Sequence, residues 1–247
     1  TERYKPSNPK SAKMRFHTQV AGVSLTAQQP LNNISRVTIQ ALAAICGGTQ
    51  SLHTNSYDEA LGLPTEKSAT IALRTQQILA EESGVANVAD PLAGSFLVEG
   101  LTKKIATEAK DLINQIETKG GALKAMELGF QQRAIHETAW KHITEVDSGH
   151  RKIIGVNHAK QDDEETFSTQ PTDLIIEEQQ KKSLAAIRSQ RDQNICNEAL
   201  EKIKSVMDTN GNLFDVIKHA VSVNCTLGEI MNTLKEKYGT YRAPSGF

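Results

Sequence analysis

Apolar and polar residues alternate in two different ways along the first 118 residues. The strand-like segments are short, and they comprise residues 14–20, 49–54 and 85–89. In the segments between them apolar residues recur at helical spacing, which predicts helices over residues 32–45, 66–83 and 95–117. Asn32 or Asn33 is expected to cap the first helix, and Gly84 to end the second.

Three strand–helix units with short connections imply parallel strands joined by right-handed crossovers, so the predicted fold class is α/β. A complete eight-fold (β/α)8 barrel needs about 250 residues for its strands and helices. The alternation ends near residue 118 of 247. The three units are therefore too few to complete such a barrel.

The second part of the chain, residues 119–247, has a different pattern and is expected to be mainly helical. Helices are predicted after the glycine pair at 120–121, over 133–147, and over a long charged stretch at 177–207; two shorter ones follow at 213–223 and 227–238. Residues 152–156 are expected to be extended. The acidic, polar run 158–173 is expected to form a surface loop or linker, and the tail 239–247 to lack helix.

Charge and composition narrow the classes of function. The formal net charge is −1, so no overall field favours nucleic acid or an anionic membrane. No apolar run reaches the roughly 18 residues that a membrane span needs. The three cysteines are widely spaced and odd in number, which favours a reduced, cytoplasmic setting, and no group of residues has metal-ligand spacing.

Polar side chains occupy two of the three predicted strands. Residues 16–19 read Phe-His-Thr-Gln and residues 50–55 read Gln-Ser-Leu-His-Thr-Asn, whereas buried parallel strands are normally runs of Val, Ile and Leu. Either these are edge strands with one wet face, or a polar ligand replaces the usual aliphatic filling. His17 and His53 are interpreted as hydrogen-bonded core residues.

Residues 15–96, and above all GGTQSLHTNSYDEALGLPT at 47–65, closely resemble the large subunit of adenosylcobalamin-dependent acyl-CoA mutases, the methylmalonyl-CoA mutase family. Weaker similarity continues to the C-terminal region. The resemblance implies that residues 1–118 are the last strand–helix units of a TIM-type (β/α)8 barrel. Residues 119–247 would then be a mainly helical linker region before a separate cobalamin-binding domain or subunit.

The resemblance also assigns roles to individual residues of this chain. Gln19 would hold the acyl thioester for the radical step and is the catalytic candidate. The other candidates divide into substrate-binding residues (Lys10, Arg15, Gln50, Ser51 and Asn55, with the two cations at the coenzyme A phosphates) and cobalamin-binding residues (Gly22, Glu59 and Gly62). Residues 15–22 and 49–59 would form one wall of a coenzyme A tunnel.

The implied activity is a radical carbon-skeleton rearrangement of an acyl-CoA, with methylmalonyl-CoA to succinyl-CoA as the first choice. The family's principal catalytic groups have no match here, so we expect the chain alone to be inactive. Its expected partners are a complementary N-terminal barrel portion and a cobalamin-binding subunit. The alternatives are a non-catalytic binding or assembly module, or a fragment, of such a mutase.

Overall fold

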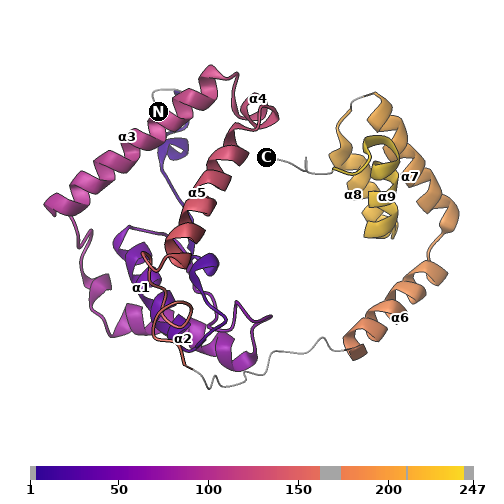
Figure 1. Ribbon diagram of the computed structural model, residues 1–247. Coiled ribbons are helices and arrows are strands. Elements are labelled where there is room, and N and C mark those ends of the chain that lie inside the picture. Colours follow the sequence, from indigo (N-terminus) through magenta and orange to yellow (C-terminus); the bar gives the residue numbers. More distant parts are fainter. Residues whose placement is uncertain (1–3, 162–173, 210, 242–247) are drawn as a thin grey trace. The chain divides into compact units, whose positions relative to one another are not determined.

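The structure is a computed structural model that describes residues 4–161, 174–209 and 211–241 (Figure 1). The chain divides into two compact units, Thr1–Gln170 and Pro171–Phe247, which are described separately. Most of the expected acidic loop (residues 162–173) and the end of the expected tail (residues 242–247) lie outside the described residues. The predicted domain boundary after residue 118, where the barrel portion would end, is a different division from this one and stays a prediction.

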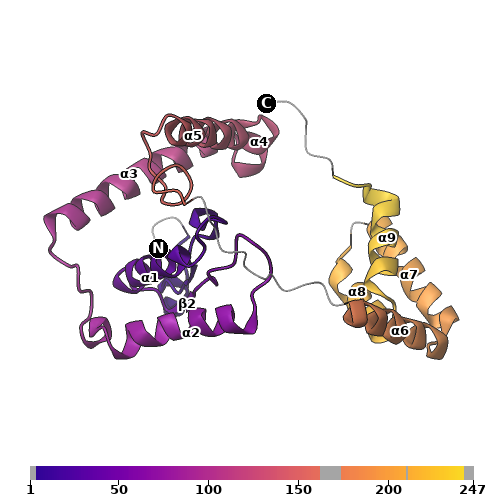
Figure 2. The same cartoon turned by 60° about the horizontal axis from the view of Figure 1, so that its bottom comes forward.

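Unit 1 contains a two-stranded parallel sheet. Strands β1 (His17–Gln19) and β2 (Ser51–His53) pair directly, with His17 opposite Ser51 and Gln19 opposite His53. Helix α1 (Asn32–Cys46) forms the connection between them, and α2 (Glu66–Glu81) packs against α1 (Figure 2). This is the predicted parallel β–α–β arrangement, with strands shorter than the sequence indicated.

A small apolar core holds this sheet against its helices. It comprises Val20, Leu25, Val37, Ala41 and Leu79, with Ile45 and Leu52 packed at its edge. Helix α2 begins at a conventional cap, because the Thr65 hydroxyl accepts a hydrogen bond from the Ser68 amide. Two short 3₁₀ helices precede α1, η1 (Pro9–Ala12) and η2 (Gly22–Ser24).

The third predicted strand is wrong. Residues 85–87 form a 3₁₀ turn, η3 (Val85–Asn87), in which the Asn87 amide donates to the Gly84 carbonyl at 3.1 Å. Helix α2 ends at Glu81, two residues earlier than predicted, and Gly84 follows its C-cap residue Glu82 by two positions, with a φ of +72° that favours glycine. Extended backbone needs a neighbouring strand to satisfy its amides, whereas this segment satisfies one internally.

The rest of unit 1 consists of helices with uncovered apolar side chains. Their bounds are α3 (Phe96–Thr118), α4 (Ala122–Glu127) and α5 (Phe130–Asp147). No residue of α3 is buried, although it carries Phe96, Leu97, Leu101, Ile105, Leu112 and Ile113. On α5, Trp140 is 72% exposed. Exposed apolar residues on this scale are typical of surfaces that pack against another chain or segment.

Unit 2 is a helical unit with its own core. Its helices are α6 (Leu174–Gln190), α7 (Gln193–Asp208), α8 (Leu213–Ser222) and α9 (Leu227–Tyr238). Helix α7 packs on α8 and α9, and the buried cluster comprises Cys196, Ala199, Ile203, Met207, Ala220, Cys225 and Ile230. The single long helix predicted over residues 177–207 is therefore wrong. It is broken before Asp192, whose carboxylate accepts the Asn194 amide and starts α7.

An ion pair holds this break against the start of α9. The Arg191 guanidinium donates to both Glu229 carboxylate oxygens, at 2.5 and 2.7 Å, and to the Asn224 carbonyl at 2.9 Å. The Arg191 side chain is only 3% exposed. Glu229 also completes a capping box with Thr226, whose hydroxyl accepts the Glu229 amide. The Glu229 carboxylate thus connects the start of α9 with Arg191, just before the start of α7.

The three cysteines are free thiols, and two of them lie in the unit 2 core. Burial raises the pKa of Cys225 to about 11, helped by its hydrogen bond to Cys196. A thiol with that pKa stays protonated and unreactive at neutral pH. Among the described helices, none is both long enough and apolar enough to cross a bilayer.

Candidate functional site

The polar residues of the two strands pair with each other across the sheet. His17 Nδ1 and Ser51 Oγ are hydrogen-bonded at 2.7 Å, and the Thr18 hydroxyl donates to the Thr49 hydroxyl at 2.8 Å. Such pairs stabilise neighbouring strands without aliphatic packing. The predicted hydrogen bonding of His17 is confirmed. Its predicted place in the core is wrong, because the residue is exposed.

Four of the predicted site residues meet where the two parallel strands end. The Gln19 amide donates to Asn55 Oδ1 at 3.1 Å, and the Asn55 amide donates to the Val20 carbonyl at 3.3 Å. A Cβ at Gly22 would lie 2.9 Å from Asn55 Nδ2 and 3.7 Å from Glu59 Oε1. We call Gln19, Gly22, Asn55 and Glu59 the strand-end cluster.

The side-chain amide of Gln19 is the part of the cluster that is exposed to a ligand. Asn55 is 2% exposed, and its amide orientation is fixed because Nδ2 faces a carbonyl. Its Oδ1 therefore orients the Gln19 amide, whose Oε1 and second N–H remain available to a ligand because Gln19 is exposed. An amide held in this way can both accept and donate hydrogen bonds at a defined point.

Two loops flank the strand-end cluster, and we call them its two walls: the loop that follows Gly22 and contains Thr26, and the loop of residues 54–58 that precedes Glu59. The loop of residues 54–58 is unusually polar for a buried segment. Residues 54–58 are all buried, and the Thr54 hydroxyl donates to the Ala72 carbonyl of α2 at 2.7 Å. Burial would raise the pKa of Asp58, but the nearby polar groups of Ser68 and Ser56 and the Thr65 amide, which donates to Asp58 Oδ2 at 3.3 Å, together lower it. Asp58 is thus held as a carboxylate, and its carbonyl accepts the Gly62 amide at 3.1 Å.

The remaining predicted residues do not join the cluster. Lys10 lies in η1 and Arg15 just before β1, and both are exposed. Arg15 lies two residues before the start of β1 and Gln19 is its last residue, so the two residues are at opposite ends of the strand. An elongated ligand is needed to reach both.

The Gln50 side chain forms hydrogen bonds to the backbone at the start of the sheet. Its Oε1 accepts the Phe16 amide at 2.8 Å, and its Nε2 donates to the Gly48 carbonyl at 2.6 Å. It therefore closes the start of the sheet with the side-chain amide that the resemblance places among the substrate-binding groups. Ser51 is likewise engaged with His17, although both are exposed.

Two residues that the sequence did not single out for this site organise it. Asn33 was expected to be a possible helix cap, but the residue before the helix is Leu31, without a side-chain cap, and Asn33 is fully buried within the first turn. Its side chain bonds to the backbone on both sides of the cluster, and Arg36 bonds to Asn33. The only sequence signal was a second asparagine beside the capping position.

Replacing Gly22 with Ala tests the close approach inside the cluster. A Cβ 2.9 Å from Asn55 Nδ2 forces that amide to move, which we expect to cost about 1–3 kcal/mol of stability. Thermal or denaturant unfolding measures it. Gly100 of α3 is the matched control, because a Cβ there meets nothing within 4 Å and Ala favours helix by about 1 kcal/mol. Equal effects of the two substitutions would contradict the close approach.

Comparison with known proteins defines the class. A family profile described as Methylmalonyl-CoA mutase matches residues 1–240, and the chain belongs to that family. Methylmalonyl-CoA mutase of Escherichia coli (strain K12) is 44% identical over 239 residues, which are 96% of this chain and 34% of the relative. The mitochondrial methylmalonyl-CoA mutase of Bos taurus is 43% identical over 240 residues, 96% of this chain and 32% of the relative.

One relative differs in its named substrate. The 2-hydroxyisobutanoyl-CoA mutase large subunit of Aquincola tertiaricarbonis is 40% identical over 243 residues, 98% of this chain and 43% of the relative. The chain thus spans about a third of the length of the methylmalonyl-CoA mutases that it matches, and less than half of this large subunit. The family resemblance stated from the sequence is confirmed.

Proposed function

We propose that this chain is the part of an adenosylcobalamin-dependent acyl-CoA mutase that forms one wall of the acyl-CoA channel. The observation that carries the proposal is the strand-end cluster, where Asn55 orients an exposed Gln19 amide beside Gly22 and Glu59. In barrels of parallel strands, active sites form at the carboxyl ends of the strands. Gln19 and Asn55 lie at that end of β1 and β2.

The proposed roles follow the line of the sheet. Gln19 bonds the acyl thioester region, and Asn55 lies beside the reacting centre. Lys10 and Arg15 meet the coenzyme A phosphates at the opposite end of the strand, where cations pair with polyphosphate. Ser51 and Gln50 flank the pantetheine arm. The length between Arg15 and Gln19 suits an extended ligand of this kind.

Gly22, Glu59 and Gly62 are proposed to face adenosylcobalamin. They fit a large planar cofactor because two of the three carry no side chain and Glu59 and Gly62 are exposed. Adenosylcobalamin, when bound, supplies the radical chemistry. The protein residues bind and orient the substrate and exclude water from the site.

The proposed reaction is the interconversion of methylmalonyl-CoA and succinyl-CoA, and we propose a cytoplasmic setting. The relatives named methylmalonyl-CoA mutase support this substrate, and the 2-hydroxyisobutanoyl-CoA relative makes that acyl-CoA the competing choice. The proposed partners are the N-terminal barrel portion and a cobalamin-binding subunit. The uncovered apolar residues of α3 and α5 support a partner of this kind. The same exposure favours the second candidate function, an assembly module without catalytic turnover.

Reconstitution distinguishes the two functions. The chain alone should show no mutase activity, because the residues that match the family's principal catalytic groups are missing from it. Mixing it with a chain that covers the other two thirds of a relative, plus adenosylcobalamin, should produce activity with methylmalonyl-CoA. Binding without turnover, with either acyl-CoA, would support the assembly module. Activity of the chain alone would overturn the division of the site between two parts.

A further inference from the structure

A buried asparagine links the two walls of the strand-end cluster. Asn33 Nδ2 donates to the Thr26 carbonyl at 2.8 Å, in the loop that follows Gly22, and to the Tyr57 carbonyl at 2.8 Å, in the buried loop that precedes Glu59. Its Oδ1 accepts the Thr26 amide at 3.1 Å. A single side chain therefore bonds the backbone of both loops.

The asparagine amide is used to capacity. Its two N–H groups donate to two carbonyls, and its oxygen accepts from the Thr26 amide and from Arg36 Nη1 at 2.7 Å. Aspartate supplies no donor and leucine no polar atom, so neither can replace these bonds. Because Asn33 is fully buried, each bond lost leaves a carbonyl or amide without water to replace it.

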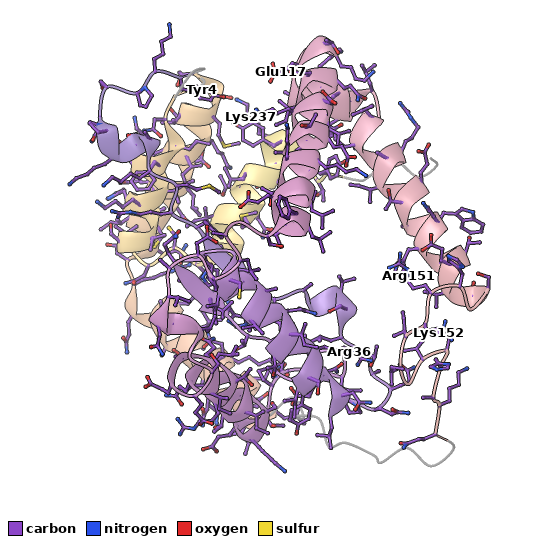
Figure 3. The ribbon with its side chains drawn as sticks, turned by 90° about the vertical axis from the view of Figure 1, so that its left-hand side faces the viewer. Tyr4, Arg36, Glu117, Arg151, Lys152 and Lys237 are labelled. Atoms are coloured by element: carbon purple, nitrogen blue, oxygen red, sulfur yellow. The ribbon has the colours of Figure 1, made fainter. Side chains whose placement is uncertain are left out.

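Arg36 connects this link to a distant segment of the chain. Besides Asn33, its guanidinium donates to the Thr26 hydroxyl at 2.9 Å and to the Ile154 carbonyl at 2.9 Å. Figure 3 labels Arg36 on α1 together with Arg151 and Lys152 of the segment that leads to Ile154. Three acceptors in different directions suit the rigid, planar fork of arginine, which a lysine ammonium does not reproduce.

The segment after α5 is itself held in place for this contact. Asn157 Oδ1 accepts the Ile153 amide at 2.7 Å, and its Nδ2 donates to the Val146 and Arg151 carbonyls. A second contact reinforces the contact of Arg36, because Gln29 Nε2 donates to the Ala159 carbonyl at 3.0 Å. A Cβ at Gly155 would lie 3.3 Å from Gln29 Cδ, and the φ of +85° at this position also favours glycine.

We propose that Asn33 and Arg36 are positioning residues that fix the spacing of the two walls, and that residues 153–159 lock them from outside the barrel portion. The proposal rests on the proposed function, since the walls matter because they carry Gly22, Glu59 and the orientation of Gln19. Arg36 acts on the ligand through Asn33 and touches no cluster residue. The segment after α5 thereby controls the geometry of a site whose residues lie 94–140 positions earlier in the sequence.

Hydrogen exchange on the full chain, without any ligand, tests the proposal. The Thr26 amide donates to Asn33 itself, and the Glu59 amide reports on the other wall. Arg36→Ala should speed the exchange of both amides by at least about tenfold while amides in the middle of α2 keep their rates. Arg36→Lys should behave like Arg36→Ala. Arg74→Ala is the matched control, because Arg74 is an exposed arginine of α2 whose guanidinium donates to the Gln77 side chain of the same helix.

Chemical rescue separates positioning from general loss of stability. Millimolar guanidinium, far below denaturing concentrations, should restore slow exchange of both amides in Arg36→Ala, because it refills the site of the missing fork. It should leave Arg36→Lys unchanged. Slow exchange of the amides in the middle of α2 in every variant shows that unit 1 is folded. Faster exchange at Thr26 alone, or no change at either amide, would overturn the proposal.

The outcome does not depend on mutase turnover. In the reconstituted enzyme, Arg36→Ala should lower kcat at least tenfold, and guanidinium should restore part of it. If the wild-type assembly shows no mutase activity, the proposed function fails, and the exchange experiment still decides whether Asn33 and Arg36 couple the two walls. Full kcat in Arg36→Ala despite loosened walls would overturn the positioning role.

Discussion

Replacing Gln19 with Ala should lower kcat of the reconstituted mutase by well over tenfold, which corresponds to about 1.4 kcal/mol or more of lost transition-state stabilisation. The physical reason is the fixed amide at the end of β1. Asn55 Oδ1 orients the Gln19 side chain, so its remaining donor and acceptor meet the substrate without a loss of side-chain entropy on binding. Truncation to Ala removes both groups and leaves Asn55 without this partner.

Steady-state kinetics with two further variants sharpen the test. Gln19→Glu keeps the length of the side chain but places a carboxylate against Asn55 Oδ1, so it should also fall at least tenfold. Gln77→Ala removes a glutamine from the exposed surface of α2 and should leave kcat unchanged. A kcat for Gln19→Ala within twofold of the wild type would exclude Gln19 from the site.

Replacing Glu229 with Ala should destabilise unit 2 by about 3 kcal/mol. The substitution leaves the Arg191 guanidinium, 3% exposed, without its carboxylate, and breaking a buried pair in this way is far costlier than the pair itself is worth. It also removes the capping box of α9. Denaturant unfolding of the full chain, with hydrogen exchange of the α9 amides as the local readout, measures the loss.

The control for this variant is Glu236→Ala in the same helix. Glu236 is 64% exposed and pairs with Lys204 at the surface, where an ion pair contributes about 0–1 kcal/mol. The two variants thus remove the same charge from one helix at different depths. Similar losses would show that helix propensity or net charge, and not the Arg191 contact, determines the stability of α9.

The same ion pair predicts a dependence on pH. The hydrogen bonds from Arg191 lower the pKa of Glu229 from 4.5 to about 2, against the opposing effect of burial. Because the unfolded chain then binds the proton more readily, the contribution of Glu229 is complete above pH 4.5 and declines as the pH falls toward 2. Between these values the free energy of unfolding should fall more steeply for the wild type than for Glu229→Ala.

Much of the fold could be predicted from periodicity alone. Periodicity predicts the helices at residues 32–45 and 66–83, because apolar positions recur along one face of each. The two polar strand segments contain residues 16–19, before the first helix, and residues 50–55, between the two helices. The third strand could not be decided in this way. Five residues of mixed size fit either a strand or a turn, and the difference lies in whether Asn87 bonds Gly84 or a neighbouring strand.

The break in the long helix shows a different limit. The sequence pattern of residues 177–207 is helical throughout. Only Asp192, a residue type that commonly caps helix N-termini, indicates that a new helix starts there. The cost of breaking the helix is offset by Arg191 reaching Glu229, which lies 38 residues later in the chain. A contact at that separation leaves no periodic trace in the sequence around it.

The strand-end cluster was found through resemblance rather than through physical pattern. Residues such as Gln19 and Asn55 stood out because polar strands are unusual, but only the family likeness suggested which of them meet. Asn33 was predicted only as a possible helix cap, because an asparagine near a helix start commonly has that role. Its actual task depends on the carbonyls of Thr26 and Tyr57, whose positions follow from the fold and not from local sequence.

The exposed indole of α5 has a practical consequence. Trp140 is the single tryptophan of the sequence, and it stands 72% exposed on one of the helices with uncovered apolar residues. All tryptophan fluorescence of the chain therefore comes from this one surface. A partner that covers α5 should shift the emission toward the blue. Assembly can thus be followed spectroscopically, without a label and without turnover.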